Sequence, residues 1–193
     1  MVECQDNYFS NIEGIKVCLL GSEEVGKTSL VFRIYNNTFP SNYDKTIEDG
    51  YYIKFNIKGE ESKICILDTG GADKCQFYLR TWIDSCNHFL LVFSIDNSDS
   101  FGRIKNLYEI IRETKRGKTI GVVILMNKCD LPESEGLRSA AEIYAKSQNL
   151  KLIECSSKKS KQIEIQNAFE TVIDERISIP GYKKDFIDYF CCI

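Results

Sequence analysis

The stretch that most constrains this chain is residues 21–28, which read Gly-Ser-Glu-Glu-Val-Gly-Lys-Thr. They fit the pattern G-x-x-x-x-G-K-[ST], in which glycines let several backbone N–H groups approach phosphate oxygens. In this pattern the lysine brings a positive charge to the outer phosphates, and the hydroxyl is an oxygen ligand for Mg²⁺. Gly21, Gly26, Lys27 and Thr28 occupy these positions. Such a loop works only between a strand and a helix.

The flanks of this loop meet that requirement. Residues 15–20 (Ile-Lys-Val-Cys-Leu-Leu) are typical of a buried strand. Residues 28–35 can form a helix whose N-terminus faces the phosphates. We therefore predict a functional phosphate-binding loop rather than a chance match.

Composition indicates one ordinary globular domain. A chain of 193 residues is long enough for a full core, and a net charge of −3 gives no reason to expect a nucleic-acid partner. No apolar run approaches the length of a membrane span. The cysteines number nine, form no C-x-x-C pair and include Cys18 and Cys65 within strand-like runs. They predict a reduced protein with buried thiols rather than a disulfide scaffold or zinc site.

Strands and helices alternate along the rest of the chain. Further strands are predicted over residues 50–57, 62–68, 88–95, 120–126 and 151–154. Helices are predicted over residues 76–84, from 96 to about 114, and 136–148. A final helix, ended by Pro180, has an apolar stripe made of Ile165, Phe169, Val172, Ile173 and Ile177.

This alternation predicts an α/β fold. The expected architecture is the P-loop NTPase fold, a mostly parallel six-stranded sheet with helices on both faces. We expect a flexible leader over residues 1–13, one nucleotide-binding domain over residues 14–178 and a C-terminal tail over residues 179–193.

Polar residues stand where three predicted strands end, and ligands of such sheets bind at the carboxyl ends of the strands. Asp68 ends one strand before Thr-Gly-Gly, and its carboxylate can hold Mg²⁺ directly or through water. Asn127, Lys128 and Asp130 follow the strand at residues 120–126, and Ser-Ser-Lys at residues 156–158 follows the last strand.

The group at residues 127–130 indicates which base is bound. A guanine edge presents two adjacent donors that one carboxylate accepts together, whereas adenine would leave the carboxylate unpaired at a cost of about 1–3 kcal/mol or more. Asp130 is therefore the predicted guanine selector. The aliphatic stem of Lys128 can cover one face of the base.

These motifs resemble those of the small GTPases of the Ras superfamily, from about residue 15 to residue 177. The matching motifs, in family order and spacing, are residues 21–28, Thr46, residues 68–71, residues 127–130 and residues 156–158. The resemblance implies GTP and GDP as ligands and Mg²⁺ as the metal, held by Thr28, Thr46 and Asp68. It implies nucleotide contacts from Gly21, Glu24, Val25, Gly26, Lys27, Thr28, Ser29, Phe39, Tyr43, Thr46, Gly71, Asn127, Lys128, Asp130, Ser156, Ser157 and Lys158.

The resemblance also implies how such a protein signals. Residues 39–49 would be the first switch and residues 69–83 the second, ordered by the γ-phosphate and Mg²⁺ and released when the phosphate is lost. Both would meet effectors and exchange or activating factors. Residues 43–51 resemble the effector loop of the Ras branch, and residues 130–156 leave no room for a Rho-type insert.

Three positions depart from the family pattern. Ala72 stands where the family carries its water-orienting glutamine, so no catalytic residue is intact. Glu23 replaces a glycine beside the γ-phosphate, and Lys45 replaces a proline of the effector loop. We expect a GTPase with slow hydrolysis. The alternatives are a non-hydrolysing, mostly GTP-bound binding module, and ordinary hydrolysis if Glu23 points to solvent and another group replaces the glutamine. A P-loop kinase or ATPase is disfavoured by residues 127–130.

The tail contains two candidate lipidation sites, Cys191 and Cys192. Prenylation of the C-a-a-X type needs a cysteine fourth from the end, where Phe190 stands. Lys183 and Lys184 are balanced by acidic neighbours, so no polybasic patch supports anchoring. The expected location is cytoplasmic, with attachment to the cytosolic face of a membrane left open.

Overall fold

The computed structural model describes residues 14–40, 46–57, 60–71 and 76–180. The predicted leader, the tail cysteines, Tyr43, Lys45 and Ala72 lie outside the described residues. The elements in chain order are β1 (Ile15–Leu20), α1 (Lys27–Asn36), β2 (Glu48–Ile57), β3 (Glu60–Thr69), α2 (Gln76–Ser85), β4 (His88–Ser94), α3 (Ser98–Thr114), β5 (Thr119–Asn127), α4 (Leu137–Ser147), β6 (Lys151–Glu154), α5 (Gln162–Asp174) and β7 (Ile177–Ser178).

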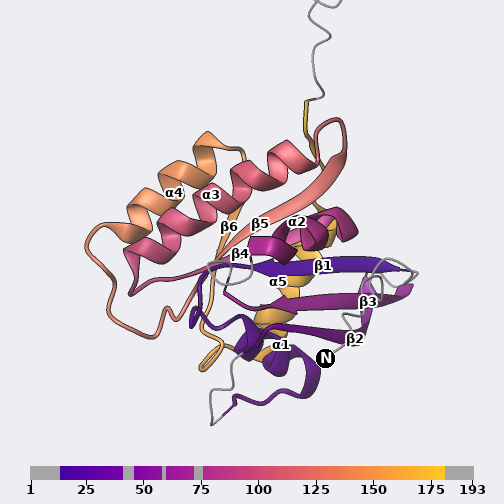
Figure 1. Ribbon diagram of the computed structural model, residues 1–193. Helices are drawn as coiled ribbons and strands as arrows, with labels where there is room; N and C mark the ends of the chain where they lie inside the picture. Colours follow the sequence, from indigo (N-terminus) through magenta and orange to yellow (C-terminus); the bar gives the residue numbers. More distant parts are fainter. Residues whose placement is uncertain (1–13, 41–45, 58–59, 72–75, 181–193) are drawn as a thin grey trace, which may run out of the picture.

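The main sheet has the strand order β2-β3-β1-β4-β5-β6 (Figure 1). Strands β3, β1, β4, β5 and β6 run parallel, whereas β2 pairs antiparallel with β3 in a hairpin that begins at Glu48 opposite Thr69. Because the parallel strands are joined through helices, their carboxyl ends meet at one edge of the sheet. The α/β class predicted from the sequence is confirmed.

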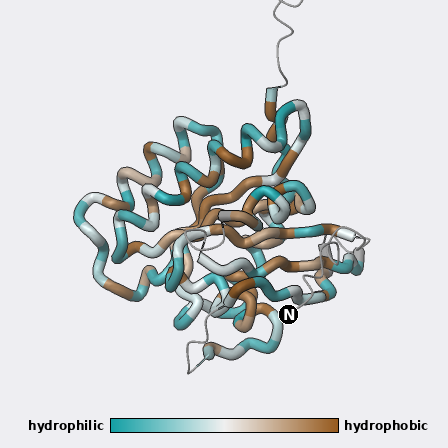
Figure 2. Tube along the Cα trace, in the orientation of Figure 1, coloured by the Kyte–Doolittle hydropathy of each residue, from teal (hydrophilic) through white to brown (hydrophobic). Residues whose placement is uncertain are grey.

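Helices cover both faces of the sheet, and side chains of each strand alternate between them. Val17 and Leu19 of β1 pack in the cluster that contains α1 and α5, whereas Cys18 and Leu20 pack in the cluster beneath α2, α3 and α4. Figure 2 shows the resulting hydrophobic centre, in which the strands are brown and the outer helix faces teal. No helix in the described part of the chain is long and apolar enough to cross a membrane.

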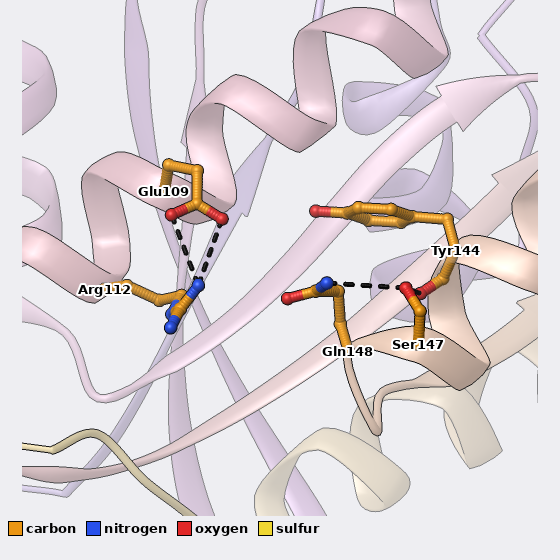
Figure 3. A network of polar contacts seen from close by, with 5 residues as sticks. All are labelled: Glu109, Arg112, Tyr144, Ser147 and Gln148. Atoms are coloured by element: carbon orange, nitrogen blue, oxygen red, sulfur yellow. Dashed lines mark hydrogen bonds and ion pairs between the residues drawn. The ribbon is translucent and has the colours of Figure 1, made fainter.

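An aromatic contact joins α3 to α4 on the second face, and each helix has local polar contacts of its own. The rings of Phe101 and Tyr144 meet edge to face, with centroids 5.8 Å apart. Nearer the solvent, Arg112 donates to both carboxylate oxygens of Glu109, and Gln148 donates to Ser147 (Figure 3). The ion pair lies within α3 and, being exposed, contributes about 0.2–1 kcal/mol, so the aromatic pair is the contact that holds the two helices together.

The last helix corrects one prediction. Helix α5 ends at Asp174, and Ile177 pairs with Ile120 as part of β7, a seventh strand that the sequence did not reveal. The extended backbone angles of Glu175 end the helix. Ile179 is buried, and its backbone forms hydrogen bonds with Gly117 and Lys118. Apolar residues four apart predicted a longer helix because a strand that follows a helix directly can continue the same spacing.

Among the described residues, five cysteines are unbonded: Cys18, Cys65, Cys86, Cys129 and Cys155. All except Cys129 are buried. Burial raises the pKa of the Cys65 thiol to about 11, which keeps it protonated and unreactive at neutral pH. Four of the five described cysteines are thus buried thiols, as predicted for Cys18 and Cys65.

Candidate nucleotide-binding site

One cavity of about 920 Å³ lies at the carboxyl ends of the parallel strands. Its size is at the upper end of the range for small-molecule sites. Of the predicted nucleotide residues, those that line it are Glu24, Gly26, Lys27, Thr28, Ser29, Phe39, Thr46, Gly71, Lys128, Asp130, Ser157 and Lys158. Five other predicted residues are buried and do not line the cavity: Gly21, Val25, Asp68, Asn127 and Ser156.

The loop between β1 and α1 has the curled shape that its glycines permit. Gly26 has a φ of 93°, and a Cβ added there would lie 2.4 Å from the side-chain nitrogen of Asn127. Both its conformation and its surroundings therefore require glycine. The Lys27 ammonium is buried by the loop and donates to the carbonyls of Gly21 at 3.1 Å and Ser22 at 2.7 Å. This places its charge at the phosphate end of the cavity.

Two hydroxyl groups converge beside this charge. Thr28, at the start of α1, and Thr46, before β2, place their Oγ1 atoms 3.0 Å apart. Adjacent ligands of an octahedral Mg²⁺, each at about 2.1 Å, are separated by about 3.0 Å. The pair therefore fits neighbouring positions on one ion, as the predicted metal set requires.

Asp68 is the third member of the predicted metal set. Its carboxylate is buried, and no described residue gives either oxygen a hydrogen bond. Burial raises the pKa of Asp68 to about 6, although nearby Thr28 and Lys27 act in the opposite direction. A buried carboxylate without a hydrogen-bond donor is costly unless a cation compensates it. The donor chemistry here therefore fits a divalent ion.

Asn127 connects three parts of the candidate site. It is fully buried at the end of β5, where its amide donates to the Val25 carbonyl at 2.8 Å and its oxygen accepts the Ser157 N–H at 2.9 Å. Because both ends of the amide are engaged within the protein, Asn127 joins the phosphate loop to residues 156–158. Asn127 supports the loops that line the cavity and does not line the cavity itself.

Asp130 follows β5, two strands away from β1 and its phosphate loop, and so defines the other end of the cavity. Its Oδ1 atom accepts a hydrogen bond of 2.5 Å from the Ser156 hydroxyl, which orients the carboxylate. Lys128 and Lys158 line the same end. Phe39 also lines the cavity and is 43% exposed, so its ring is available to a ligand.

Two residues that brace this end were missed in the sequence. Arg33 on α1 donates to the backbone carbonyls of Ser157 at 3.1 Å and Lys158 at 3.0 Å. Gln162 at the start of α5 donates to the carbonyl of Ile34 at 2.7 Å. An isolated arginine or glutamine on a helix has the pattern of a solvated face, so no sequence signal distinguishes either residue.

Glu23 lies directly against Gly71. A Cβ added to Gly71 would be 2.0 Å from Cγ of Glu23, so the glutamate chain passes across the glycine backbone. Both residues line the cavity near Lys27 and Thr28. The Glu23 side chain thus occupies space beside the phosphate end and does not turn away from the second switch.

The Ras family model matches residues 16–178, which is most of the chain. Proteins of this family bind guanine nucleotides and Mg²⁺ and hydrolyse GTP. The match runs from the second residue of β1 to the end of β7. It agrees with the strand order, the curled phosphate loop and the paired hydroxyl groups described above. The chain therefore belongs to the Ras family and is a small GTPase of the Ras superfamily.

Proposed function

We propose that residues 14–178 form a guanine-nucleotide-binding domain that binds GTP and GDP with Mg²⁺ in the 920 Å³ cavity. The observation that carries this proposal is the arrangement of that cavity. Lys27 stands at one end for phosphates, and Asp130 stands at the other for the base. A ligand that satisfies both ends needs a phosphate chain and a base edge with two donors, which guanine supplies.

Thr28, Thr46 and Asp68 would hold the magnesium ion. When bound, Mg²⁺ neutralises charge on the phosphate oxygens. Thr28 is held in α1. Thr46 belongs to the first switch, so the Thr46 hydroxyl would approach or leave the ion as that segment moves. Asp68 supplies the negative charge that its buried position leaves uncompensated.

Hydrolysis is proposed to be slow. Catalysis of phosphoryl transfer to water consists of positioning the water and stabilising charge. Ala72 has no group that could hold a water, and Glu23 places bulk and negative charge beside Gly71. The same two residues favour the second candidate, a non-hydrolysing module that stays GTP-bound and acts by binding partners.

The switch segments, residues 39–49 and 69–83, are the proposed surface for effectors and for exchange or activating factors. Their backbones meet where the N–H of Gly70 donates to the carbonyl of Ile47 at 2.8 Å, so movement of one reaches the other. By its effector loop we assign the protein to the Ras branch. The proposed location is the cytoplasm or, if Cys191 or Cys192 carries lipid, the cytosolic face of a membrane.

Titration of nucleotide-free protein with a fluorescent guanine nucleotide tests the proposal. Wild type should bind tightly, excess ATP should not compete, and Lys27→Ala should weaken binding by about a hundredfold or more because the phosphates lose their charged partner. The control is Lys105→Ala, which removes a lysine that stacks on Phe101 away from the cavity. Affinity of Lys27→Ala within threefold of wild type would remove the phosphate loop from the proposal.

Single-turnover hydrolysis of GTP with Mg²⁺ distinguishes the two candidates. A slow GTPase should convert bound GTP at roughly a tenth or less of the 10⁻⁴ per second scale of an unassisted Ras protein. A binding module should form no GDP above the rate of free GTP in solution, even over several days. Rapid turnover of wild type would refute both and would require a residue that replaces the missing glutamine.

A further inference from the structure

The single tryptophan of the chain joins the two switch segments. Trp82 lies on α2, in the second switch, and only 2% of it is exposed. Its indole Nε1–H donates to Oε2 of Glu48 at 2.5 Å. Glu48 is the first residue of β2 and lies in the first switch, two positions after Thr46. A buried donor on one switch thus binds an acceptor on the other.

Trp82 is the fixed partner of this pair. Its side chain packs in the core cluster with Leu67, Leu79 and Ile83, and its ring stacks on Tyr78 with centroids 6.2 Å apart. Moving a large ring out of such extensive packing contacts costs free energy. Glu48 is an exposed, long side chain that would sample many rotamers in water. The hydrogen bond therefore restrains Glu48 more than it restrains Trp82.

Backbone contacts carry this restraint toward Thr46. Glu48 pairs with Thr69 in the β2–β3 ladder, and the carbonyl of Ile47 accepts from Gly70 at 2.8 Å. Thr69 is itself fixed through its hydroxyl to the carbonyl of Leu19 at 2.6 Å. Thr46 directly precedes this hydrogen-bonded segment, and its Oγ1 atom lies 3.0 Å from Oγ1 of Thr28. What fixes Glu48 also fixes the point from which Thr46 extends into the cavity.

We propose that Trp82 is a positioning residue for the first switch, acting through Glu48 on the placement of Thr46. The inference rests on the proposed function, because Thr46 matters only if a nucleotide and Mg²⁺ occupy the cavity. Its consequence is that α2 and the first switch respond as one unit. A displacement of α2 breaks the hydrogen bond and frees the segment that carries Thr46.

The experiment compares wild type with Trp82→Phe, Glu48→Leu, their double variant and Glu48→Gln. Phenylalanine keeps an aromatic ring but lacks the N–H donor, and glutamine keeps an acceptor oxygen. The matched control is Glu109→Leu, which makes the same chemical change in the exposed ion pair between Glu109 and Arg112. Release of a fluorescent, non-hydrolysable GTP analogue and of fluorescent GDP is measured in Mg²⁺.

Each of Trp82→Phe and Glu48→Leu should speed release of the GTP analogue about tenfold, which corresponds to about 1.4 kcal/mol. Release of GDP should change less than about twofold, because Thr46 is required chiefly when the γ-phosphate is present. Release from the double variant should be no faster than from either single variant, since all three variants lose the same hydrogen bond. Glu48→Gln should remain within about twofold of wild type, and Glu109→Leu should match it.

Equal acceleration of GDP and GTP-analogue release, with a matching fall in melting temperature, would show that Trp82 only stabilises the fold and would overturn the proposal. Additive effects in the double variant would also overturn it. If wild type binds no guanine nucleotide, the proposed function fails separately. Hydrogen exchange of residues 46–50 then decides the link between the switches: Trp82→Phe and Glu48→Leu must each accelerate it, and no acceleration refutes the link.

Discussion

The side-chain amide of Asn127 donates a hydrogen bond of 2.8 Å to the carbonyl of Val25, joining the end of β5 to the phosphate loop. The same side chain accepts the N–H of Ser157 at 2.9 Å. Three loops that are far apart in the sequence are thereby held by one buried residue. The two ends of the cavity keep their spacing because this residue spans them.

Asn127→Ala should destabilise the fold and weaken nucleotide binding together. It leaves the Val25 carbonyl and the Ser157 N–H without their partner, which should lower the free energy of unfolding by about 2–4 kcal/mol. Nucleotide affinity should fall at least about tenfold, although Asn127 does not line the cavity. Urea unfolding and nucleotide titration measure the two effects. Asn106→Ala, on an exposed position of α3, is the control, and equal stability of both variants would contradict the bridging role.

Base choice should depend on Asp130. Asp130→Asn exchanges one acceptor oxygen for a donor, which suits xanthine because xanthine has an acceptor where guanine has its amino group. Competition between GTP and XTP should therefore move toward XTP by about tenfold or more. Asp99→Asn, in the exposed first turn of α3, should keep the wild-type preference. Unchanged GTP preference in Asp130→Asn would mean that another residue reads the base.

Removal of the metal should reveal how much the buried Asp68 carboxylate destabilises the fold. Its pKa of about 6, raised from 3.8 by burial, means that the charged form destabilises the fold above that pH. With GDP and a chelator at pH 7.5, Asp68→Asn should therefore be more stable than wild type by on the order of 2–3 kcal/mol. With GDP and Mg²⁺ the order should reverse, because the ion then compensates the carboxylate. Thermal melts in both conditions measure this, and a variant less stable in both would argue against a metal role.

Hydrolysis should depend jointly on Glu23 and Ala72. Ala72→Gln alone should recover little, since the Glu23 chain still crosses Gly71. Glu23→Gly alone should also recover little, since no residue then orients the water. The double variant should exceed the product of the two single rate effects, because both changes act on one water. Single-turnover assays on the four proteins measure the coupling, and independent effects would show that the residues act at separate steps.

Stability should fall in mild acid because of His88. Burial lowers the pKa of this imidazole, and no described residue hydrogen-bonds its Nδ1 atom. The unfolded chain therefore takes up the proton first, so the stability gained from neutral His88 is present above about pH 6.5 and is lost as pH falls through that value. His88→Asn should reduce the stability difference between pH 7.5 and pH 5.5, because the substituted residue does not titrate in this range.

The control for this prediction is internal. Asp68, whose pKa is raised to about 6, acts with the opposite sign in the same range, but it is present in both proteins and cancels in the comparison. Urea unfolding at both pH values, without Mg²⁺, gives the difference. Parallel pH dependence in wild type and His88→Asn would assign the acid response to other groups.

The sequence predicted the elements whose patterns are local. The apolar run at residues 15–20, the glycine loop and the polar residues after each strand all have short-range signals, and β1, α1 and the sheet class followed from them. The end of α5 was wrong because Ile177 continues a helical spacing while it pairs with Ile120 in β7. Strand pairing is a long-range contact that no local pattern encodes.

The site was predictable to a similar degree. Lys27, Thr28 and Asp130 were predicted from motifs, and in the structure they line one cavity. The brace from Arg33 to residues 157 and 158 spans more than a hundred positions of the chain and depends on how α1 packs beside α5. The contact between Glu23 and Gly71 likewise appears only when the loops are placed in space.

Strand β7 also has a geometric consequence. It pairs with Thr119 and Ile120 at the start of β5, whereas Asn127 at the other end of the same strand adjoins the cavity. At about 3.3 Å per residue, the length of β5 separates the two points by roughly 25 Å. The described chain therefore ends, at Pro180, on the side of the sheet opposite the cavity, near the start of β5 (Figure 1). A tether attached there would leave the mouth of the cavity and both switch segments facing outward, open to diffusing ligands and partners.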